Sequence, residues 1–316
     1  MKFNDYKIAK VLKESITKMG WNRPTDIQFK AIKPILEGED VLAIAQTGTG
    51  KTASFVIPTL NAIHNALLKD EAHFVRCLVM VPTRELAVQI QEVFDEVGSE
   101  TNVKSRAIIG GVEQENQIED LNKGVDIVIS TPGRLFDLCS QGYLKLDRLQ
   151  TLVLDEADHM LDLGFVKDIR DLMRHIPQKR QTLFFSATIN KEIKKIAYDL
   201  VRNAIRIQIS PKNPVAKNID HAVAHIEMDD KRFFLENIIK ENDEKKILVF
   251  VRTKVRAERV VKAMERVAIT SKTIHGDVEQ NQRFEILNEF KAGNLKVLIT
   301  TDVAARGIDI KGVNAV

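Results

Sequence analysis

Short apolar runs alternate along the chain with longer stretches in which apolar residues recur at helical spacing. The apolar runs are rich in Val, Ile and Leu, as expected for strands that are buried on both faces. Before residue 210 the pattern predicts strands at 41–45, 78–81, 127–130, 152–155 and 183–186. It predicts amphipathic helices at 84–97 and 191–200. This half of the chain is therefore expected to form a parallel sheet covered by helices.

The alternation is interrupted by the segment Ser-Pro-Lys-Asn-Pro-Val-Ala at 210–216, whose two prolines disfavour both helix and strand. The pattern then resumes, with strands expected at 247–251, 273–275 and 297–301 and helices near 232–239, 255–267 and 282–290. We predict a first domain at 1–209, a linker at 210–217 and a second α/β unit at 218–316. The expected fold class is α/β, with doubly wound parallel sheets.

Composition narrows the class of protein. Of 316 residues, 44% are hydrophobic and 29% are charged, which excludes a disordered or fibrous chain. Lys and Arg number 47 against 44 Asp and Glu, so bulk positive charge does not hold nucleic acid, and any such site must be local. The two cysteines have no nearby partners, so we expect neither a disulfide framework nor a zinc site. The chain has no apolar run of about 18 residues and no signal-peptide core. We therefore expect no membrane association and a cytoplasmic location.

The strand at 41–45 leads directly into a glycine-rich segment and then a helical pattern. The segment comprises Ala45, Gln46, Thr47, Gly48, Thr49, Gly50, Lys51 and Thr52, which nearly fits GxxxxGK[ST], with Ala45 in place of the first glycine. Backbone amides of such a loop surround phosphate oxygens, Lys51 can reach the β and γ phosphates, and Thr52 can offer its hydroxyl to Mg²⁺. An ordinary strand-to-helix turn accounts for the glycines but not for Gly-Lys-Thr after an apolar strand. The segment predicts a nucleotide site.

Two other predicted strands end in polar residues that suit the same site. Asp155 ends one strand and is expected to bind Mg²⁺, while Glu156 is expected to orient or deprotonate the attacking water. Another strand ends in Ser186 and leads to Thr188. These two hydroxyls can cap the next helix, or they can hydrogen-bond Asp158 and sense the γ phosphate. The sequence leaves both interpretations open. The two hydroxyls come just before a helix, and they are also expected at the same sheet edge as Asp158, where the ends of parallel strands meet.

Together these motifs resemble those of the DEAD-box ATP-dependent RNA helicases, and the resemblance covers the whole chain. The motifs stand in the family's order: AQTGTGKT at 45–52, PTRELA at 82–87, GG at 110–111, TPGR at 131–134, DEAD at 155–158, SAT at 186–188, HGD at 275–277, Gln280 with Arg283, and TDVAARGID at 301–309. The segment LVFVRTK at 248–254 is similar to that of the bacterial RhlE-type subgroup. The resemblance implies two RecA-like domains that use ATP and Mg²⁺, with RNA lying across both.

Residues 1–29 resemble the family's adenine-reading Q motif. The amide of Gln28 can donate and accept at once, matching N6 and N7 of adenine, and the ring of Trp21 can stack on the base. Phe3 is the isolated aromatic residue ahead of the motif. The chain departs from the family pattern with Asp26 where proline is common and with Trp21 where Phe or Tyr is usual.

The resemblance implies that RNA is held by its sugar-phosphate backbone, so binding should tolerate any sequence and favour RNA over DNA. The implied RNA-binding residues are Arg84, Gly111, Thr131, Gly133 and Arg134 in the first domain and Gly276, Asp277, Arg283, Thr301 and Asp302 in the second. Gly307 and Asp309 are implied to reach the nucleotide from the second domain. His159, just after the DEAD tetrad, is expected to lie behind the catalytic residues.

Two other functions use the same chemistry: an ATP-gated RNA clamp that seldom turns over, and a DNA translocase. The family's last motif, HRxGRxGR, does not occur before Val316. We therefore expect the second domain to be incomplete and the chain as given to bind nucleotide but hydrolyse it poorly, since arginine fingers are typically worth about 10³–10⁵ in turnover.

Overall fold

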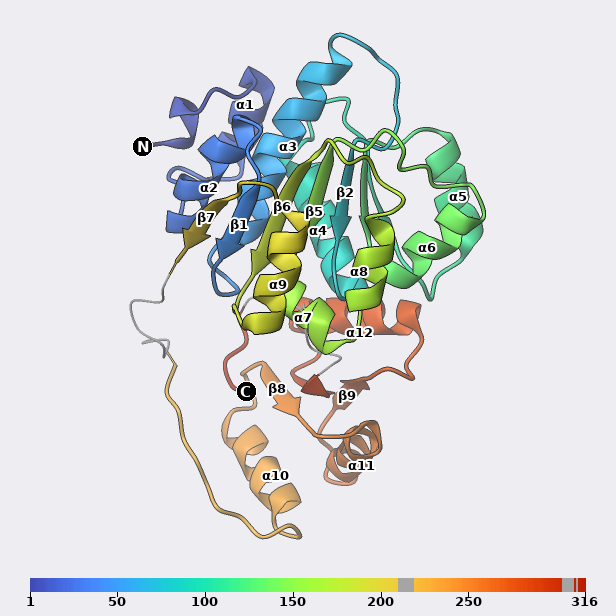
Figure 1. The fold of residues 1–316 in the computed structure, drawn as a ribbon. Coiled ribbons are helices and arrows are strands. Elements are labelled where there is room, and N and C mark those ends of the chain that lie inside the picture. The colour runs from blue at the N-terminus through green and yellow to red at the C-terminus, as the bar shows by residue number, and fades with distance from the viewer. Residues whose placement is uncertain (210–218, 303–309, 311) are drawn as a thin grey trace. The chain divides into compact units, whose positions relative to one another are not determined.

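The computed structural model describes residues 1–209, 219–302, 310 and 312–316 (Figure 1). The chain divides into two compact units, Met1–Lys212 and Asn213–Val316. Within the described residues, the first unit has a seven-stranded parallel sheet and the second a three-stranded parallel sheet. The predicted α/β class is therefore confirmed, while the predicted linker lies outside the described residues.

The first sheet has the strand order β3-β4-β2-β5-β6-β1-β7, and every pair is parallel. Its strands are β1 Val41–Ile44, β2 Cys77–Met80, β3 Ser105–Ile108, β4 Ile127–Ser130, β5 Thr151–Leu154, β6 Gln181–Ser186 and β7 Ile205–Gln208. The sequence pattern predicted the five inner strands and missed β3 and β7, which form the two edges. An edge strand is covered on fewer sides, so exposed residues such as Arg106 and Arg206 break the apolar run.

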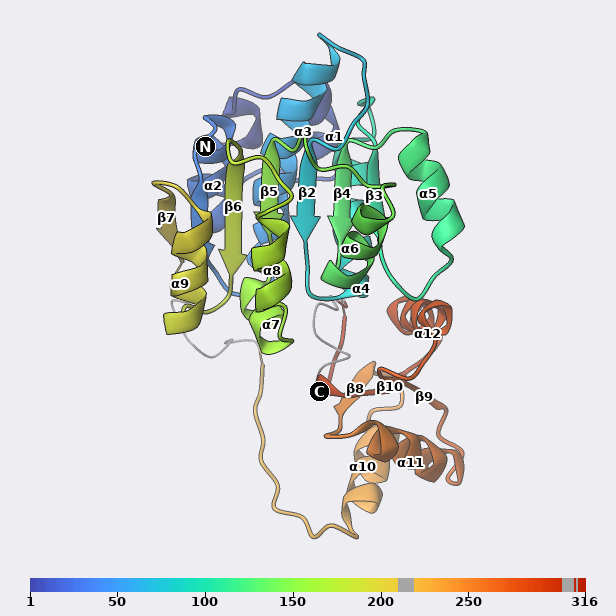
Figure 2. The ribbon, with the colours of Figure 1, turned by 45° about the vertical axis from the view of Figure 1, so that its right-hand side comes forward.

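Helices cover both faces of this sheet. They are η1 Phe3–Asp5, α1 Lys10–Lys18, α2 Asp26–Leu36, α3 Lys51–Leu67, α4 Arg84–Val97, α5 Gln114–Asn122, α6 Pro132–Ser140, α7 Ala157–Asp162, α8 Val166–Leu172 and α9 Lys191–Leu200. Figure 2 shows α6 to α9 in front of the sheet, α1 to α4 behind it, and α5 beside the β3 edge. This is the doubly wound arrangement that the alternating pattern predicts.

The core of the first unit is built from strand residues that point alternately to the two helical layers. Phe184 belongs to a buried cluster with Ile193 of α9. Its neighbour Phe185 faces the other layer, where it meets Phe55 of α3 with ring centroids 5.2 Å apart. Phe55 in turn contacts Phe94 of α4 at 6.3 Å. Continuous apolar runs are needed in the inner strands because both faces are covered in this way.

The second unit repeats this plan on a smaller scale, with strand order β8-β10-β9. Its elements are α10 Lys231–Glu241, β8 Ile247–Phe250, α11 Lys254–Glu265, β9 Ser271–Ile274, α12 Gln280–Ala292 and β10 Val297–Thr300. Val297 and Ile299 of β10 join one buried cluster and Leu298 joins another, so the sheet is packed on both faces. All six elements lie within two residues of their predicted positions. No helix among the described residues is long and apolar enough to cross a membrane.

Candidate functional site

In the first unit, the residues predicted for phosphate, metal and RNA follow neighbouring strands of the sheet, at its carboxyl edge. The phosphate and metal candidates follow β1, β5 and β6, which are adjacent in the sheet. Arg84, Gly111 and Thr131 follow β2, β3 and β4, which are also adjacent. Because β5 lies beside β2, the candidates for nucleotide phosphate and the candidates for RNA occupy two halves of the edge that meet at this pair of strands.

The loop after β1 has the backbone geometry of an anion-binding turn. Gly48 and Gly50 have φ values of 76° and 90°, which glycine adopts without strain, and Gly50 is the N-cap of α3. At the start of the loop Ala45 is buried, and its amide donates to the carbonyl of Ser186 at 3.0 Å, which fixes the loop to the end of β6. The backbone amides at the beginning of α3 are thereby available to phosphate oxygens.

Lys51 supplies a buried positive charge at this turn. Only 6% of the residue is exposed, and its Nζ has no hydrogen-bond partner within the part of the chain that the structure describes. A buried ammonium group without a partner is costly, so the site is suited to an anion that replaces the lost water. The phosphates of a nucleotide fit this requirement, and they would lie at the N-terminus of α3 where the helix dipole also favours them.

Asp155 follows β5 and is 2% exposed. Burial raises the pKa of its carboxyl group to about 6, a shift that the nearby Lys51 opposes and Glu156 reinforces. Oδ1 accepts a hydrogen bond from the amide of Glu156 at 2.9 Å. A bound cation would favour the ionised form of this carboxyl group.

Magnesium is usually held by one or two protein groups together with phosphates and waters. The described residues contain no group of three His, Cys, Asp or Glu side chains able to hold a metal by themselves. Asp155 and the half-buried Thr52, in the first turn of α3, are the groups that would hold Mg²⁺ beside the phosphates.

Glu156 has an unusual backbone conformation for a residue with a side chain. Its φ and ψ are 51° and 47°, in the left-handed region, where it forms the N-cap of α7. This conformation costs about 1–2 kcal/mol for a non-glycine residue and is typical of functional sites. The Oε2 atom lies 2.9 Å from Nδ1 of His159, one turn along α7. His159 therefore lies directly behind the predicted catalytic carboxylate.

Asp158 connects α7 to the end of β6. Its Oδ2 atom accepts hydrogen bonds from the amide of Ala187 at 3.2 Å and from the amide and hydroxyl of Thr188 at 2.9 and 3.0 Å. The hydroxyl of Ser186 donates to the carbonyl of Thr188 at 2.7 Å. The cap of α9 is instead Asn190, whose side chain accepts from the amide of Ile193. Of the two interpretations that the sequence allowed, helix capping by Ser186 and Thr188 is therefore wrong, and hydrogen bonding to the second carboxylate is observed for Thr188 but not for Ser186.

Gln28 is 7% exposed and links α2 to the phosphate loop. Its Oε1 accepts from the amide of Thr25 at 2.9 Å, and its Nε2 donates to the carbonyl of Gly50 at 3.1 Å. One amide hydrogen and one lone pair remain for a ligand. Asp26 occupies the first position of α2, where an acidic residue is favoured by the helix dipole, which explains why the chain tolerates it in place of proline.

The aromatic residues of the Q motif form one small cluster. The rings of Phe3 and Trp21 have centroids 6.4 Å apart, and Tyr6 lies 6.3 Å from Phe3. Phe3 is only 3% exposed, whereas Trp21 is half-buried. Phe3 therefore packs behind Trp21, and Trp21 presents the ring that a base could reach.

The half of the edge that is predicted to bind RNA is organised around two arginines. Arg134 Nη2 donates to the carbonyl of Val112 at 3.1 Å, which joins the loops after β4 and β3. The guanidinium of Arg84 lies against Gly110, where an added Cβ would come within 3.4 Å of Nη2. Thr131 caps α6, Gly111 has a φ of 78°, and Gly133 is exposed with open space around it. The loops after β2, β3 and β4 are thus held together beside exposed backbone.

In the second unit, the predicted residues gather at the carboxyl edge of β9 and β10. Gly276 and Asp277 follow β9, Thr301 and Asp302 follow β10, and Arg283 lies in the first turns of α12. Asp277 forms an ion pair with Nζ of Lys254 at 2.5 Å, which lowers the pKa of Asp277. Sequence reasoning did not assign a role to Lys254, the first residue of α11, because no local pattern links it to Asp277. Gly307 and Asp309 lie outside the described residues.

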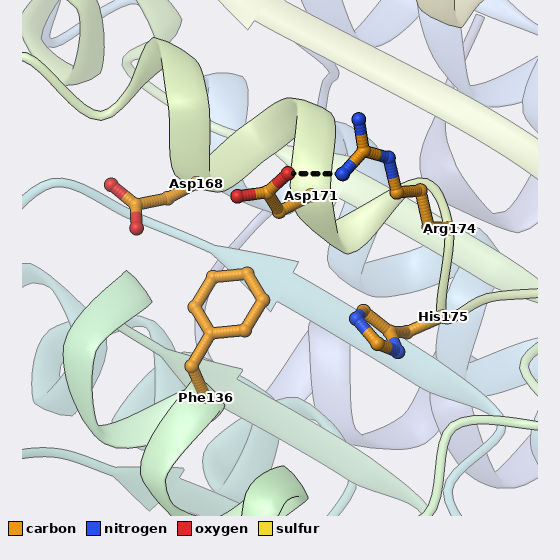
Figure 3. A pocket seen from close by; sticks show the side chains of 5 residues that line it. All are labelled: Phe136, Asp168, Asp171, Arg174 and His175. Carbon is orange, nitrogen blue, oxygen red and sulfur yellow. Dashed lines mark hydrogen bonds and ion pairs between the residues drawn. The ribbon is translucent and has the colours of Figure 1, made fainter.

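A separate surface hollow of about 250 Å³ is lined by residues of α6 and α8 and of the turn after α8 (Figure 3). Its lining residues are Phe136, Asp168, Asp171, Arg174 and His175, and Asp171 pairs with Arg174 at 3.0 Å. None of the residues predicted for nucleotide or RNA lines this hollow.

Residues 25–196 match the DEAD/DEAH box helicase family, and residues 230–316 match the helicase conserved C-terminal domain. The DEAD-box ATP-dependent RNA helicase CshA of Streptococcus pneumoniae is 40% identical over 100% of this chain and 59% of its own length. The ATP-dependent RNA helicase RhlB of Shewanella amazonensis is 36% identical over 100% of this chain and 73% of its own.

Among solved structures, S. cerevisiae Dbp5 bound to RNA and ADP BeF3 has a TM-score of 0.88 and 29% identity, over 99% of this chain and 78% of that one. The chain spans about three fifths of the length of the CshA proteins from Streptococcus pneumoniae and Listeria monocytogenes.

Proposed function

The chain belongs to the DEAD/DEAH box helicase family, and from this premise we propose that it is the nucleotide- and RNA-binding part of an ATP-dependent RNA helicase. The proposed enzyme binds the RNA backbone without sequence preference and separates short duplexes locally, coupled to ATP hydrolysis. The observation that carries this proposal is the division of one sheet edge into a half with the glycine-rich loop and buried Lys51 and a half with Arg84 and Arg134.

In this proposal the loop at 45–52 and Lys51 hold the triphosphate, and Thr52 and Asp155 hold Mg²⁺, which neutralises phosphate charge when bound. Glu156 orients the attacking water and accepts its proton. Gln28 and Trp21 hold the adenine ring. The hydrogen bonds from Thr188 to Asp158, with Ser186 donating to the carbonyl of Thr188, support a role for the SAT segment in reporting the state of the nucleotide.

We propose that ATP and single-stranded RNA together close the two domains on each other, and that hydrolysis reopens them. Closure requires contacts that exist only when both ligands are bound. The motifs on both sides of the predicted linker support this, and Gly307 and Asp309 are the residues expected to reach the nucleotide from the second domain. The RhlE-type subgroup and the cytoplasmic location stay predictions.

The test is the RNA affinity of the full-length protein with and without a non-hydrolysable ATP analogue. The analogue should tighten binding of a single-stranded RNA at least tenfold, and it should have no such effect in the Lys51→Ala variant, which loses the phosphate contact. No effect of the analogue on the wild-type protein would contradict the closure model.

The same assay separates the alternative functions. Equal tightening on a matched DNA strand would favour a DNA translocase, because backbone contacts that involve the 2′-hydroxyl distinguish RNA from DNA. Slow RNA dissociation without displacement of a short duplex would favour an RNA clamp.

A further inference from the structure

A histidine to which the proposed mechanism assigns no role lies next to the predicted catalytic carboxylate. His159 is the third residue of α7, and its Nδ1 lies 2.9 Å from Oε2 of Glu156. The side chain of Glu156 is 9% exposed and that of His159 is 26% exposed, so the contact is largely shielded from water. A shielded hydrogen bond to a carboxylate is stronger and better defined than one at the surface.

We propose that His159 is a positioning residue that holds the Glu156 carboxylate in the orientation needed for ATP hydrolysis. This inference rests on the proposed function, in which Glu156 acts on the attacking water. When Nδ1 carries its proton and donates to Oε2, the other oxygen, Oε1, is left to accept a hydrogen bond from water. The histidine does not touch substrate in this arrangement and acts through the glutamate.

The side chain of Glu156 needs a positioning contact because the backbone of this residue is strained. With φ at 51° and ψ at 47°, the residue occupies the left-handed region, in which a side chain is destabilising. The amide of Glu156 is held by Oδ1 of Asp155, which fixes the backbone but leaves the side chain free to rotate. The contact with Nδ1 of His159 restrains the far end of this side chain.

His159 is itself held in place from the other side. Its amide donates to Oδ1 of Asp158 at 3.3 Å, and Oδ2 of the same carboxylate accepts from Thr188. A continuous set of hydrogen bonds therefore runs from Thr188 through Asp158 and His159 to Glu156. The SAT segment is thereby linked by hydrogen bonds to the backbone of the residue whose side chain contacts Glu156.

The test compares substitutions of the same shape in the full-length protein. Asparagine and leucine have the same branching, but only asparagine offers an N–H at the position of Nδ1. In RNA-stimulated ATP hydrolysis, His159→Leu should lower kcat about tenfold, the effect typical of losing a hydrogen bond that orients a reacting group. Its KM for ATP should stay within about twofold, while His159→Asn should keep kcat within about threefold of the wild-type value.

A third variant keeps the test decisive if His159→Leu fails to fold. His159→Asp has the shape of the asparagine variant but repels Glu156, so its kcat should fall at least as far as expected for His159→Leu. Leucine, aspartate and asparagine variants with equal kcat would overturn the proposal, as would a loss of activity expressed entirely in KM.

A double substitution asks whether the histidine acts through the glutamate. In a Glu156→Gln background, His159→Leu should cause no further loss in single-turnover hydrolysis, because the group it positions has been removed. A further tenfold loss would overturn the proposal.

The failure of this proposal is distinguishable from failure of the proposed function. If the wild-type protein showed no RNA-stimulated ATP hydrolysis, both the proposed function and the role of His159 would be contradicted. If the wild-type protein were active and the His159→Leu variant equally active, only the role of His159 would be contradicted.

Discussion

At the scale of single residues, the site keeps several groups in states that are unfavourable without ligand. Lys51 is buried without a hydrogen-bond partner among the described residues, Asp155 is buried with a raised pKa, and Glu156 has a left-handed backbone. Each feature lowers the free energy of unfolding of the ligand-free protein, and we expect ligand binding to offset that destabilisation. Residues of this kind are expected to show opposite effects on stability and on function.

Asp155 gives a pH-dependent example. In the folded protein its pKa is raised from 3.8 to about 6, so its contribution to stability is fully present below pH 3.8 and is lost as pH rises through 6. In metal-free buffer at pH 7.5, Asp155→Asn should therefore raise the melting temperature by at least about 3 °C while weakening Mg²⁺-dependent nucleotide binding. The thermal gain should shrink as pH falls from 7 toward 4, and a gain independent of pH would contradict the burial of an ionisable group.

At the scale of elements, the phosphate loop depends on its neighbours. The start of α2 is joined to the loop by Gln28, and the start of α7 is joined to the end of β6 by Asp158. Both joints use a side chain at a helix N-terminus, where unpaired backbone amides favour polar partners. The local sequence could predict the helices, but the joints arise only when distant segments pack together.

Gly50 is the most demanding position in the loop. Its φ is 90°, and a Cβ there would lie 2.5 Å from Nε2 of Gln28. Gly50→Ala should lower the affinity for ATP at least tenfold in an equilibrium titration, because both the backbone and the Gln28 contact must shift. The double variant with Gln28→Ala should recover stability in part, since the clash is removed but the backbone strain remains.

Gly142→Ala is the matched control for this prediction. Gly142 has a φ of 80° and nothing within 4 Å of an added Cβ. This variant should lose about 1 kcal/mol of unfolding free energy from backbone strain alone and keep the ATP affinity of the wild-type protein. Equal losses of ATP affinity in the two alanine variants would contradict a specific role for the Gln28 contact.

At the scale of the whole molecule, the two units have separate sheets and separate buried clusters. The first unit contains every described residue predicted to contact the nucleotide or metal. Helices cover both faces of its seven-stranded sheet, as an independently folding domain requires.

Residues 1–209 should therefore fold by themselves. We expect one cooperative transition in urea and an ATP affinity within about threefold of that of the full-length protein measured without RNA. Lys51→Ala in the same fragment provides the control for specific phosphate binding. A fragment that fails to fold would show that the first unit depends on the second.

Some features could be predicted from local sequence and others could not. The inner strands were predictable because burial on both faces forces a continuous apolar run, whereas β3 and β7 have exposed positions and were missed. The residues of the phosphate loop and the acidic tetrad were predictable because they directly follow such runs. The ion pair between Asp277 and Lys254 joins residues on different elements, and no local pattern indicates it.

The sequence by itself determined the α/β class, the order of the strands and helices along the chain, and the residue types available to phosphate, metal and RNA. These follow from periodicity and from motifs whose members are close in sequence. The tertiary structure decided which strands are neighbours, and hence that the sheet edge divides into two halves. It also decided that Thr188 hydrogen-bonds Asp158 and that His159 lies behind Glu156. Such contacts depend on directions in space that one-dimensional spacing leaves open, because side chains from different strand ends meet only after the sheet has formed.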